Sequence, residues 1–484
     1  MSSGDDQARA EGSGATTDGE PVEGRSCPAG TTAPAVSVRA VLTTPLGHLA
    51  LAMLVVELLA GMQTYLNQTV LPLVATDLGA RAHYGLITGA AMVPTFLTMP
   101  LGGAMLARWR ADRLMTVLTA VLVVGAILGA TAPVVAVYVA GEVVRGLASG
   151  ALATVTAGVL VAGLPEAWRR LFLAASSATW IVSSLVGPVY AAGVSAAWGW
   201  RWALVVYVPV LVAARLVMAC EIHGLRVTDD GEARPPVVPA IVMAAGVAVI
   251  GLVPAGTVGF AVAGPVGLAA VAWACLRVLP RGVARLVPGR PTAIATLAWV
   301  CGAYFALDFL VSPAGHDVLR LSAGSLGWAL TTAGVLWSAV ALHCGAHPAR
   351  ERRAYLARTS AGGLLFAVGG ALSAGALGGL VPWWGLHAGW GLAGLGMGLT
   401  HQDTIIRCVT DPAELGNPAD GISQAAAATS VTVAVNAGGA ALGTLVTSLV
   451  APTSAGVQAG IVVPTVLALT AALAVTPLLA RRAA

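Results

Sequence analysis

Long apolar stretches, separated by short segments rich in arginine, proline and glycine, fill the chain from residue 49 to residue 480. A helix needs about 20 mostly apolar residues to cross a bilayer core about 30 Å thick. Fourteen stretches meet this requirement: 49–75, 84–106, 113–132, 134–164, 171–194, 202–220, 237–257, 258–279, 291–313, 323–344, 356–379, 382–406, 421–450 and 457–480. The pattern predicts an all-α polytopic membrane protein with fourteen transmembrane helices.

Two polar breaks divide these helices into groups of six, two and six. EIHGLRVTDDGEARPP follows the sixth stretch and RVLPRGVARLVPGRP follows the eighth. The first 40 residues are rich in glycine, serine, threonine and acid, with too little apolar surface to offset the entropy of folding. We therefore expect a disordered cytoplasmic tail at 1–40, a six-helix bundle at 41–220, loops and two accessory helices at 221–290, and a second six-helix bundle with a short tail at 291–484.

The arginines predict how the chain crosses the membrane, because cytoplasmic loops carry the positive excess. With the N-terminus inside, most loop arginines face the cytoplasm. Those that face out are Arg81, Arg201 and Arg320. We therefore expect a multi-pass protein of the cell (inner or plasma) membrane with both termini cytoplasmic.

Composition supports this picture and excludes several classes of protein. Apolar residues make up 57% and charged residues 10% of the chain, against roughly 45–50% and about 25% in soluble domains. All 26 basic residues are arginine, which excludes the P-loop lysine of an ATP-driven motor and Schiff-base catalysis. The net charge of +4 and the absence of a basic stripe argue against nucleic acid. Six scattered cysteines support neither a metal site nor a cofactor.

Four segments carry a resemblance to a known family. They are YLNQTVLPLVATDLG at 65–79, RGLASG at 145–150, GPVYAAGVSAAWGWRWALVVYVP from Gly187, and GLGMGLTHQDTIIRCVTDPAELGNPADGIS from Gly394. Together they resemble the major facilitator superfamily, especially its fourteen-spanning drug/proton antiporter branch. The resemblance implies two six-helix bundles around a central cavity that opens alternately to either side, as in other transporters built from repeats.

The loop after the second helix departs from the family pattern. Relatives usually have Gly-x-x-x-Asp-Arg-x-Gly-Arg, whereas GAMLARWRADR has Ala107 at the Asp position and Arg110 at the Gly position. The resemblance still implies a cytoplasmic gate here, with a rearranged set of charges. Its candidate residues are Gly103, Arg108, Arg110, Asp112 and Arg113.

The fifth helix contains the antiporter-like motif of the resemblance. Gly187 and Gly193 would permit close helix contact, and Pro188 would kink the helix because it removes a backbone hydrogen bond. We expect a conformational role for all three residues.

Charges inside a membrane are costly and face a cavity or a partner by default. Glu57 shares one face of the first helix with Gly61, Thr64 and Gln68, and amide Asn67 lies at a site where relatives often have an acid. This polar stripe predicts a cavity wall, with Glu57 as a candidate for proton coupling. The alternative is a structural carboxyl bonded to a neighbouring helix.

Three further charges stand out. Glu142 and Arg145 are spaced i,i+3, so their side chains can meet. They form either a coupling pair or a self-neutralising structural pair. Asp308 lies one turn after Tyr304, within about 8 Å of the predicted outer end of its helix. It is a third candidate for proton coupling, with an interfacial carboxyl as the alternative.

Tyr304 is a further candidate for the cavity wall. His401, Asp403 and Asn436 are weaker candidates, and a polar contact between helices is the favoured alternative for each. The hypothesis for the whole chain is a monomeric, proton-coupled exporter of hydrophobic or amphipathic small molecules. A metabolite importer or uniporter of the same fold is one alternative. A membrane enzyme or scaffold is another, but the chain has no H-E-x-x-H and no G-x-S-x-G motif.

Overall fold

The computed structural model describes residues 38–224, 237–253, 257–410, 422, 424–450 and 455–483. Nearly all of the predicted disordered tail therefore lies outside the described residues, as do residues 225–236 of the loop after the sixth predicted span. Within the described ranges, regular secondary structure is helical throughout. This agrees with the physics of a bilayer, where a helix satisfies every backbone polar group within its own segment.

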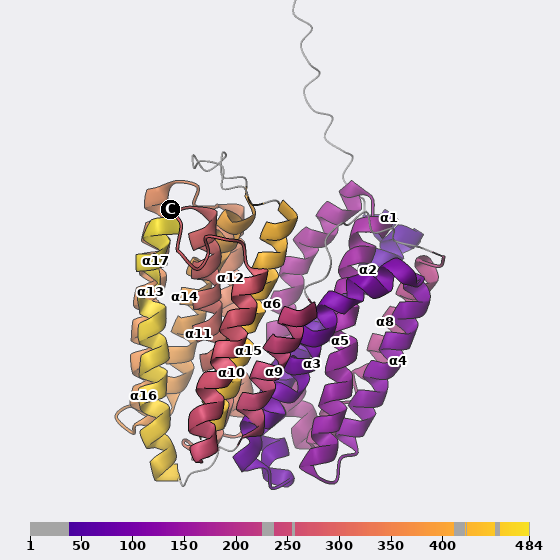
Figure 1. Cartoon of the computed structure of the whole chain (residues 1–484). Helices are drawn as coiled ribbons and strands as arrows, with labels where there is room; N and C mark the ends of the chain where they lie inside the picture. The colour runs from indigo at the N-terminus through magenta and orange to yellow at the C-terminus, as the bar shows by residue number, and fades with distance from the viewer. Residues whose placement is uncertain are drawn as a thin grey trace, which may run out of the picture. The chain divides into compact units, whose positions relative to one another are not determined.

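The helices follow one another along the whole described chain (Figure 1). In order they are α1 (Val38–Thr43), α2 (Pro45–Asp77), the 3₁₀ turn η1 (Arg81–His83), α3 (Tyr84–Arg108), α4 (Ala111–Ala130), α5 (Val135–Gly163), α6 (Glu166–Trp198), α7 (Trp200–Ala203), α8 (Val208–Glu221), α9 (Val237–Leu252), α10 (Val258–Val278), α11 (Arg290–Asp317), α12 (Ala323–Ala346), α13 (Arg352–Leu377), α14 (Trp384–Val409), α15 (Gln424–Val450), α16 (Ala455–Ala474) and α17 (Thr476–Ala483).

Each predicted span contains at least one helix, although two of the spans are interrupted. The sixth is divided between α7 and α8, where Pro209 occupies the first turn of α8. The fourteenth is divided between α16 and α17. Among the described residues, ten helical segments are long and apolar enough to cross a membrane, and Val237–Leu252 and Val433–Leu449 are shorter apolar helices. The protein is therefore a multi-pass membrane protein, while the count of fourteen spans stays a prediction.

Side-chain caps set the beginning of several helices. The Thr44 hydroxyl accepts a hydrogen bond from the Gly47 amide at 3.1 Å, and Pro45 occupies the first turn of α2. Ser322 caps α12 in the same way, accepting from the Ser325 amide at 3.2 Å. Such caps satisfy amides that have no partner within the helix, and they fix where these two helices enter the membrane.

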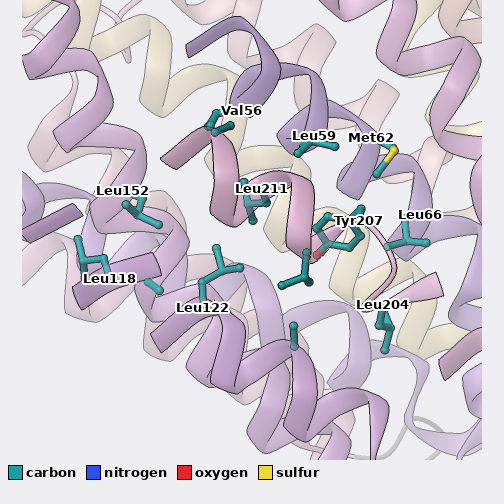
Figure 2. Close-up of a cluster of buried hydrophobic side chains, with 14 of the residues drawn as sticks. Val56, Leu59, Met62, Leu66, Leu118, Leu122, Leu152, Leu204, Tyr207 and Leu211 are labelled. Atoms are coloured by element: carbon teal, nitrogen blue, oxygen red, sulfur yellow. The ribbon is translucent and has the colours of Figure 1, made fainter. Parts of the chain in front are cut away.

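Buried apolar side chains form three clusters. The first lies within residues 49–222 and the second within residues 283–483. We call the helices that build them the N-terminal group (α2–α8) and the C-terminal group (α11–α17). Figure 2 shows part of the first cluster, where Leu59, Met62 and Leu66 of α2 lie near Tyr207 and Leu211. Close van der Waals packing of this kind holds helices together in lipid.

The third cluster joins the central helix pair to its surroundings. It is built from Met243, Val247, Val271, Ala274, Ala437, Ala440 and Ala441. These residues come from α9, α10 and α15, which lie next to one another in Figure 1. The α9–α10 pair thus packs directly on the C-terminal group, and α9 also packs on α3.

Candidate functional site

A cavity of about 280 Å³ lies among α2, α3, α4, α5 and α8, with one residue each from α11 and α15. Its apolar and aliphatic wall includes Val56, Ala60, Leu71, Ile87, Met92, Met99, Leu122, Gly146, Leu211 and Phe309. Its polar wall includes Gln63, Thr64, Asn67, Gln68, Thr88, Thr95, Tyr138, Glu142, Arg145, Ser149, Arg215 and Asn436. Most of the lining surface is apolar, although more than half of the lining residues are polar, and a mainly apolar space with convergent polar groups is typical of a small-molecule site.

The polar wall centres on an ion pair from α5. Arg145 donates to Glu142 Oε2 at 2.6 Å, and both side chains are buried, with 3% and 4% of their surfaces exposed. The predicted i,i+3 contact is therefore present. The same Arg145 Nη2 also donates to Asn67 Oδ1 of α2 at 2.8 Å. Asn67 thus ties the ion pair to the helix that forms the opposite wall.

The first-helix stripe differs in part from its prediction. Thr64, Asn67 and Gln68 line the cavity, but Glu57 and Gly61 are outside its lining. Glu57 accepts a hydrogen bond from the Ser176 hydroxyl of α6. The lining residues of α2 run from Val56 to Leu71, so Glu57 lies at one end of this stripe, where it contacts α6.

Asp308 joins the two groups of helices. Gln68 Nε2 of α2 donates to Asp308 Oδ2 of α11, and the Asp308 side chain is buried with 8% exposed. Asp308 is buried against α2 rather than placed at an exposed helix end. Helix α11 continues to Asp317, nine residues further, which places Asp308 roughly 13 Å from the end of the helix.

Most of the other cavity candidates lie elsewhere. Tyr304 is outside the cavity lining, stacked on Trp390 at 5.0 Å between ring centroids. His401 is also outside it, edge-on to Trp337 at 5.4 Å. Asn436 does line the cavity, from α15.

Asp403 is the remaining cavity candidate, and the structure places it in a contact between helix and loop. Its carboxylate accepts from Arg358 Nη1 at 2.9 Å and from the Ala349 amide at 3.0 Å. Arg407, also on α14, donates to the carbonyls of Ala349 and Arg350. These bonds clamp the α12–α13 loop onto the end of α14, outside the cavity lining.

The predicted gate forms a smaller cluster than expected. Arg110 donates to Asp112 at 2.8 and 3.1 Å, and His223 Nδ1, after α8, is 3.2 Å from the same carboxylate. Arg108 and Arg113 are exposed, and Gly103 lies within α3. Asp112 therefore joins the loop before α4 to the end of α8.

The motif of the fifth predicted span lies within α6. Gly187 is packed on α2, because a Cβ atom there would stand 2.9 Å from Tyr65 Cβ. Pro188 lies inside the continuous helix, with its carbonyl close to Gly327 of α12. Gly193 has open space where a Cβ would be. The expected close contact is thus present at Gly187 and absent at Gly193.

A second link between the groups lies between the start of α3 and the end of α11. The Tyr84 hydroxyl donates to Asp317 Oδ2 at 3.0 Å, and both side chains are buried. His316 Nδ1 is 2.9 Å and Arg81 Nη2 is 3.9 Å from the other carboxylate oxygen. Residues of η1 and α3 thereby meet the end of α11.

Arg215 was not among the predicted site residues, although its position in a span was a sufficient signal. Arg215 lies inside the predicted span 202–220, so the rule that singled out Glu142 applies to it equally. The structure places it on the cavity wall with 8% of its surface exposed. Tyr84 and Asp317 were also missed, because each lies at a helix end where polar residues are ordinary.

Comparison with known proteins decides the family. The model of the Major Facilitator Superfamily matches residues 53–418. The chain belongs to the Major Facilitator Superfamily. Its members are transporters, so the alternative of a membrane enzyme is set aside.

Curated relatives of the superfamily match a limited stretch. The chain is 28% identical over 150 residues to the "Fatty acid resistance protein FarB" of Neisseria gonorrhoeae, covering 31% of the chain and 30% of the relative. It is 30% identical over 140 residues to the "Probable multidrug-efflux transporter Rv1634" of Mycobacterium tuberculosis (strain ATCC 25618 / H37Rv), covering 29% and 30%. The matched stretch thus spans less than a third of each relative's length.

Solved structures of the superfamily share the fold. A bacterial homologue of the human drug peptide transporters PepT1 and PepT2 superposes with a TM-score of 0.61 at 16% identity, covering 90% of this chain and 97% of that one. The peptide transporter POT in complex with sulfate gives 0.62 at 13% identity, covering 92% and 98%. At these identities the likeness supports the fold alone.

Proposed function

We propose that the chain is a proton-coupled secondary transporter that exports hydrophobic or amphipathic small molecules by alternating access. The observation that carries this proposal is the buried Glu142–Arg145 pair on the wall of a mainly apolar cavity. A carboxylate in such a place can exchange a proton with the space that also holds a substrate. Arginine keeps its proton, so Arg145 remains a fixed charge beside it.

The hydrogen bonds suggest how a proton would change the conformation. Protonation of Glu142 removes the charge that Arg145 neutralises, while the bond from Arg145 to Asn67 of α2 remains. Protonation of Asp308 weakens its bond with Gln68, which joins α2 to α11. The first event breaks up an ion pair within α5 and leaves Arg145 bonded to Asn67 of α2, whereas the second weakens a contact between helix groups that must move relative to one another during transport.

A proton gradient supplies enough energy for export. One proton that enters down roughly 150 mV yields about 3.5 kcal/mol. That energy sustains a gradient of a few hundredfold for an exported substrate. Since all basic residues are arginine, the chain has no P-loop lysine for an ATP motor.

Relatives and charge distribution support the direction and the location. The names of two relatives describe fatty acid resistance and multidrug efflux. We place the chain in the fourteen-spanning drug/proton antiporter branch, in the plasma membrane, with both termini cytoplasmic, because most loop arginines then face the cytoplasm. In this orientation the Tyr84–Asp317 link lies at the outer end of the helices.

Transport in proteoliposomes tests the coupling. A proton gradient should accelerate uptake of a hydrophobic dye into vesicles that are acidic inside, and Glu142→Gln and Asp308→Asn should each reduce this acceleration at least tenfold. Glu351→Gln is the matched control, because Glu351 is exposed in the α12–α13 loop and outside the cavity lining. Wild-type flux that does not respond to the gradient, or a gradient response that Glu142→Gln and Asp308→Asn both leave unchanged, would refute proton coupling.

A further inference from the structure

Arg215 of α8 is a buried charge without a counter-charge. Its Nη1 donates to the Thr156 hydroxyl of α5 at 2.8 Å. Its Nε has no hydrogen-bond partner among the residues that the structure describes, and no described carboxylate lies within ion-pair distance of it. With 8% of its surface exposed, the guanidinium has lost most of its hydration. A buried charge in this situation is costly until an opposite charge is supplied.

The charged residues that line the cavity have a net charge of one positive unit. Among the described residues, the charged groups of the lining are Glu142, Arg145 and Arg215. The first two neutralise each other at 2.6 Å. The space beside them is therefore positive, and such a space concentrates anions.

We propose that Arg215 binds the anionic head group of the substrate, and that the transported class is amphipathic organic carboxylates. The guanidinium presents a planar fork of donors that matches a carboxylate. Thr156 accepts from Nη1 and Nε is enclosed without a partner, so the head group would meet the guanidinium from the cavity side, where Arg215 lines the wall. This inference rests on the proposed transport function and names the substrate class for the same cavity.

The apolar wall suits the hydrocarbon part of such a molecule. Leu211 lies one turn before Arg215 on α8 and also lines the cavity, as do Met99 and Leu122. The volume of about 280 Å³ is near the lower end of the range of about 300–1,000 Å³ for small-molecule sites. A single medium-length chain with one charged end fits this space.

The head-group site is separate from the ion pair that we propose to carry the proton. Thr156 follows Arg145 by eleven residues on α5, which corresponds to roughly 16 Å along the helix. An anion on Arg215 therefore leaves Arg145 paired with Glu142. The cavity can therefore bind a substrate head group at Arg215 while Glu142 remains available to exchange a proton.

Binding of three ligands of equal chain length to the purified full-length protein tests the inference. The ligands are octanoate, octanol and octyltrimethylammonium, measured at equilibrium without a proton gradient. Octanoate should bind at least tenfold more tightly than the other two. Arg215→Gln should reduce the affinity for octanoate at least tenfold and leave octanol unchanged, while Arg215→Lys, which keeps the charge and loses the fork, should give an intermediate value.

The matched control is Arg277→Gln, since Arg277 lies over the Trp273 ring on α10 and outside the cavity lining. It should bind octanoate like the wild type. The inference is refuted if octanol binds as tightly as octanoate, or if Arg215→Gln weakens both ligands equally. If Arg215→Gln fails to fold, the affinities of the wild type and of Arg215→Lys for octanoate and octanol provide the test. The binding measurement uses no proton gradient, so a negative binding result does not bear on proton coupling. A transport experiment that shows no proton coupling likewise does not change the binding result.

Discussion

At the scale of single residues, the cost of a charge in an apolar surrounding explains most of the polar contacts. Glu142 and Arg145 meet each other, Asp403 meets Arg358, and Asp308 accepts from Gln68. Each of these acids is buried and each has a partner that offsets the loss of hydration. Arg407 and Arg215 are buried without an ion pair within the described residues, but Arg407 donates to two carbonyls and lies over the Tyr355 ring. Arg215 donates to one hydroxyl and lines the cavity, which is why we assign it to an anionic ligand.

Removal of one partner of the α5 ion pair should cost more than removal of both. Glu142→Ala leaves Arg145 buried without its counter-charge, which typically destabilises a protein by about 3–5 kcal/mol. The double variant Glu142→Ala with Arg145→Met removes the uncompensated charge and should recover much of that loss. Denaturant unfolding in detergent measures both. A double variant less stable than the single one would contradict this account.

Arg358 allows the same comparison away from the cavity. Arg358→Gln leaves Asp403 with the Ala349 amide but without its counter-charge, so the free energy of unfolding should fall. The affinity for octanoate should stay within about twofold, because Asp403 and Arg358 are outside the cavity lining. Equilibrium binding and thermal unfolding separate the two effects. A large loss of affinity in a folded variant would show that this clamp reaches the cavity.

At the scale of helices, small residues decide where neighbouring backbones come close. Gly187 lets α6 pack on α2, and Gly334 lets α12 pack on α6, since a Cβ atom at Gly334 would stand 2.5 Å from Ser184 Cβ. Helices in lipid associate through such close packing. The presence of a glycine does not by itself indicate a close helix contact, because Gly193, on α6 like Gly187, faces open space.

A matched pair of substitutions on α6 checks this difference. Gly187→Val forces atoms into the contact with Tyr65 and Met62, and overpacking of this kind costs about 1–3 kcal/mol. A Cβ atom at Gly193 would meet nothing within 4 Å, so Gly193→Val should leave thermal stability nearly unchanged. Unfolding temperatures of the purified variants in one detergent give the comparison. Equal loss at both positions would mean that the valine itself, rather than the α2 contact, is responsible.

At the scale of the whole molecule, the N-terminal and C-terminal groups are joined by polar links of very large sequence separation. Gln68 and Asp308 are 240 residues apart, and Tyr84 and Asp317 are 233 residues apart. In the orientation that we propose, the second link lies at the outer end. A transporter must break such a link to open outward, so this bond should influence the balance between conformations.

Tyr84→Phe should shift that balance. The variant removes the hydrogen bond to Asp317 and keeps the ring, so the outward-open population should rise severalfold. The measurement is the rate at which an impermeant maleimide labels Thr88→Cys, a cavity position, from outside in a background without native cysteines. Tyr190→Phe is the control, because its hydroxyl donates to the Ala203 carbonyl within the N-terminal group. If the labelling rate in Tyr84→Phe is unchanged, the Tyr84–Asp317 bond does not influence outward opening.

The apolar runs alone were enough to place the helices, because a bilayer requires segments of a minimum length whose backbone bonds are internal. The contact of Glu142 with Arg145 was also predictable, since it follows from helix geometry over three residues. The contact of Glu57 with Ser176, the bond between Gln68 and Asp308, and the lack of a counter-charge at Arg215 were not. Each depends on how helices rotate and pack against partners far along the chain. Local sequence patterns carry no information on such partners. The tertiary structure therefore decides which polar residues of distant helices meet.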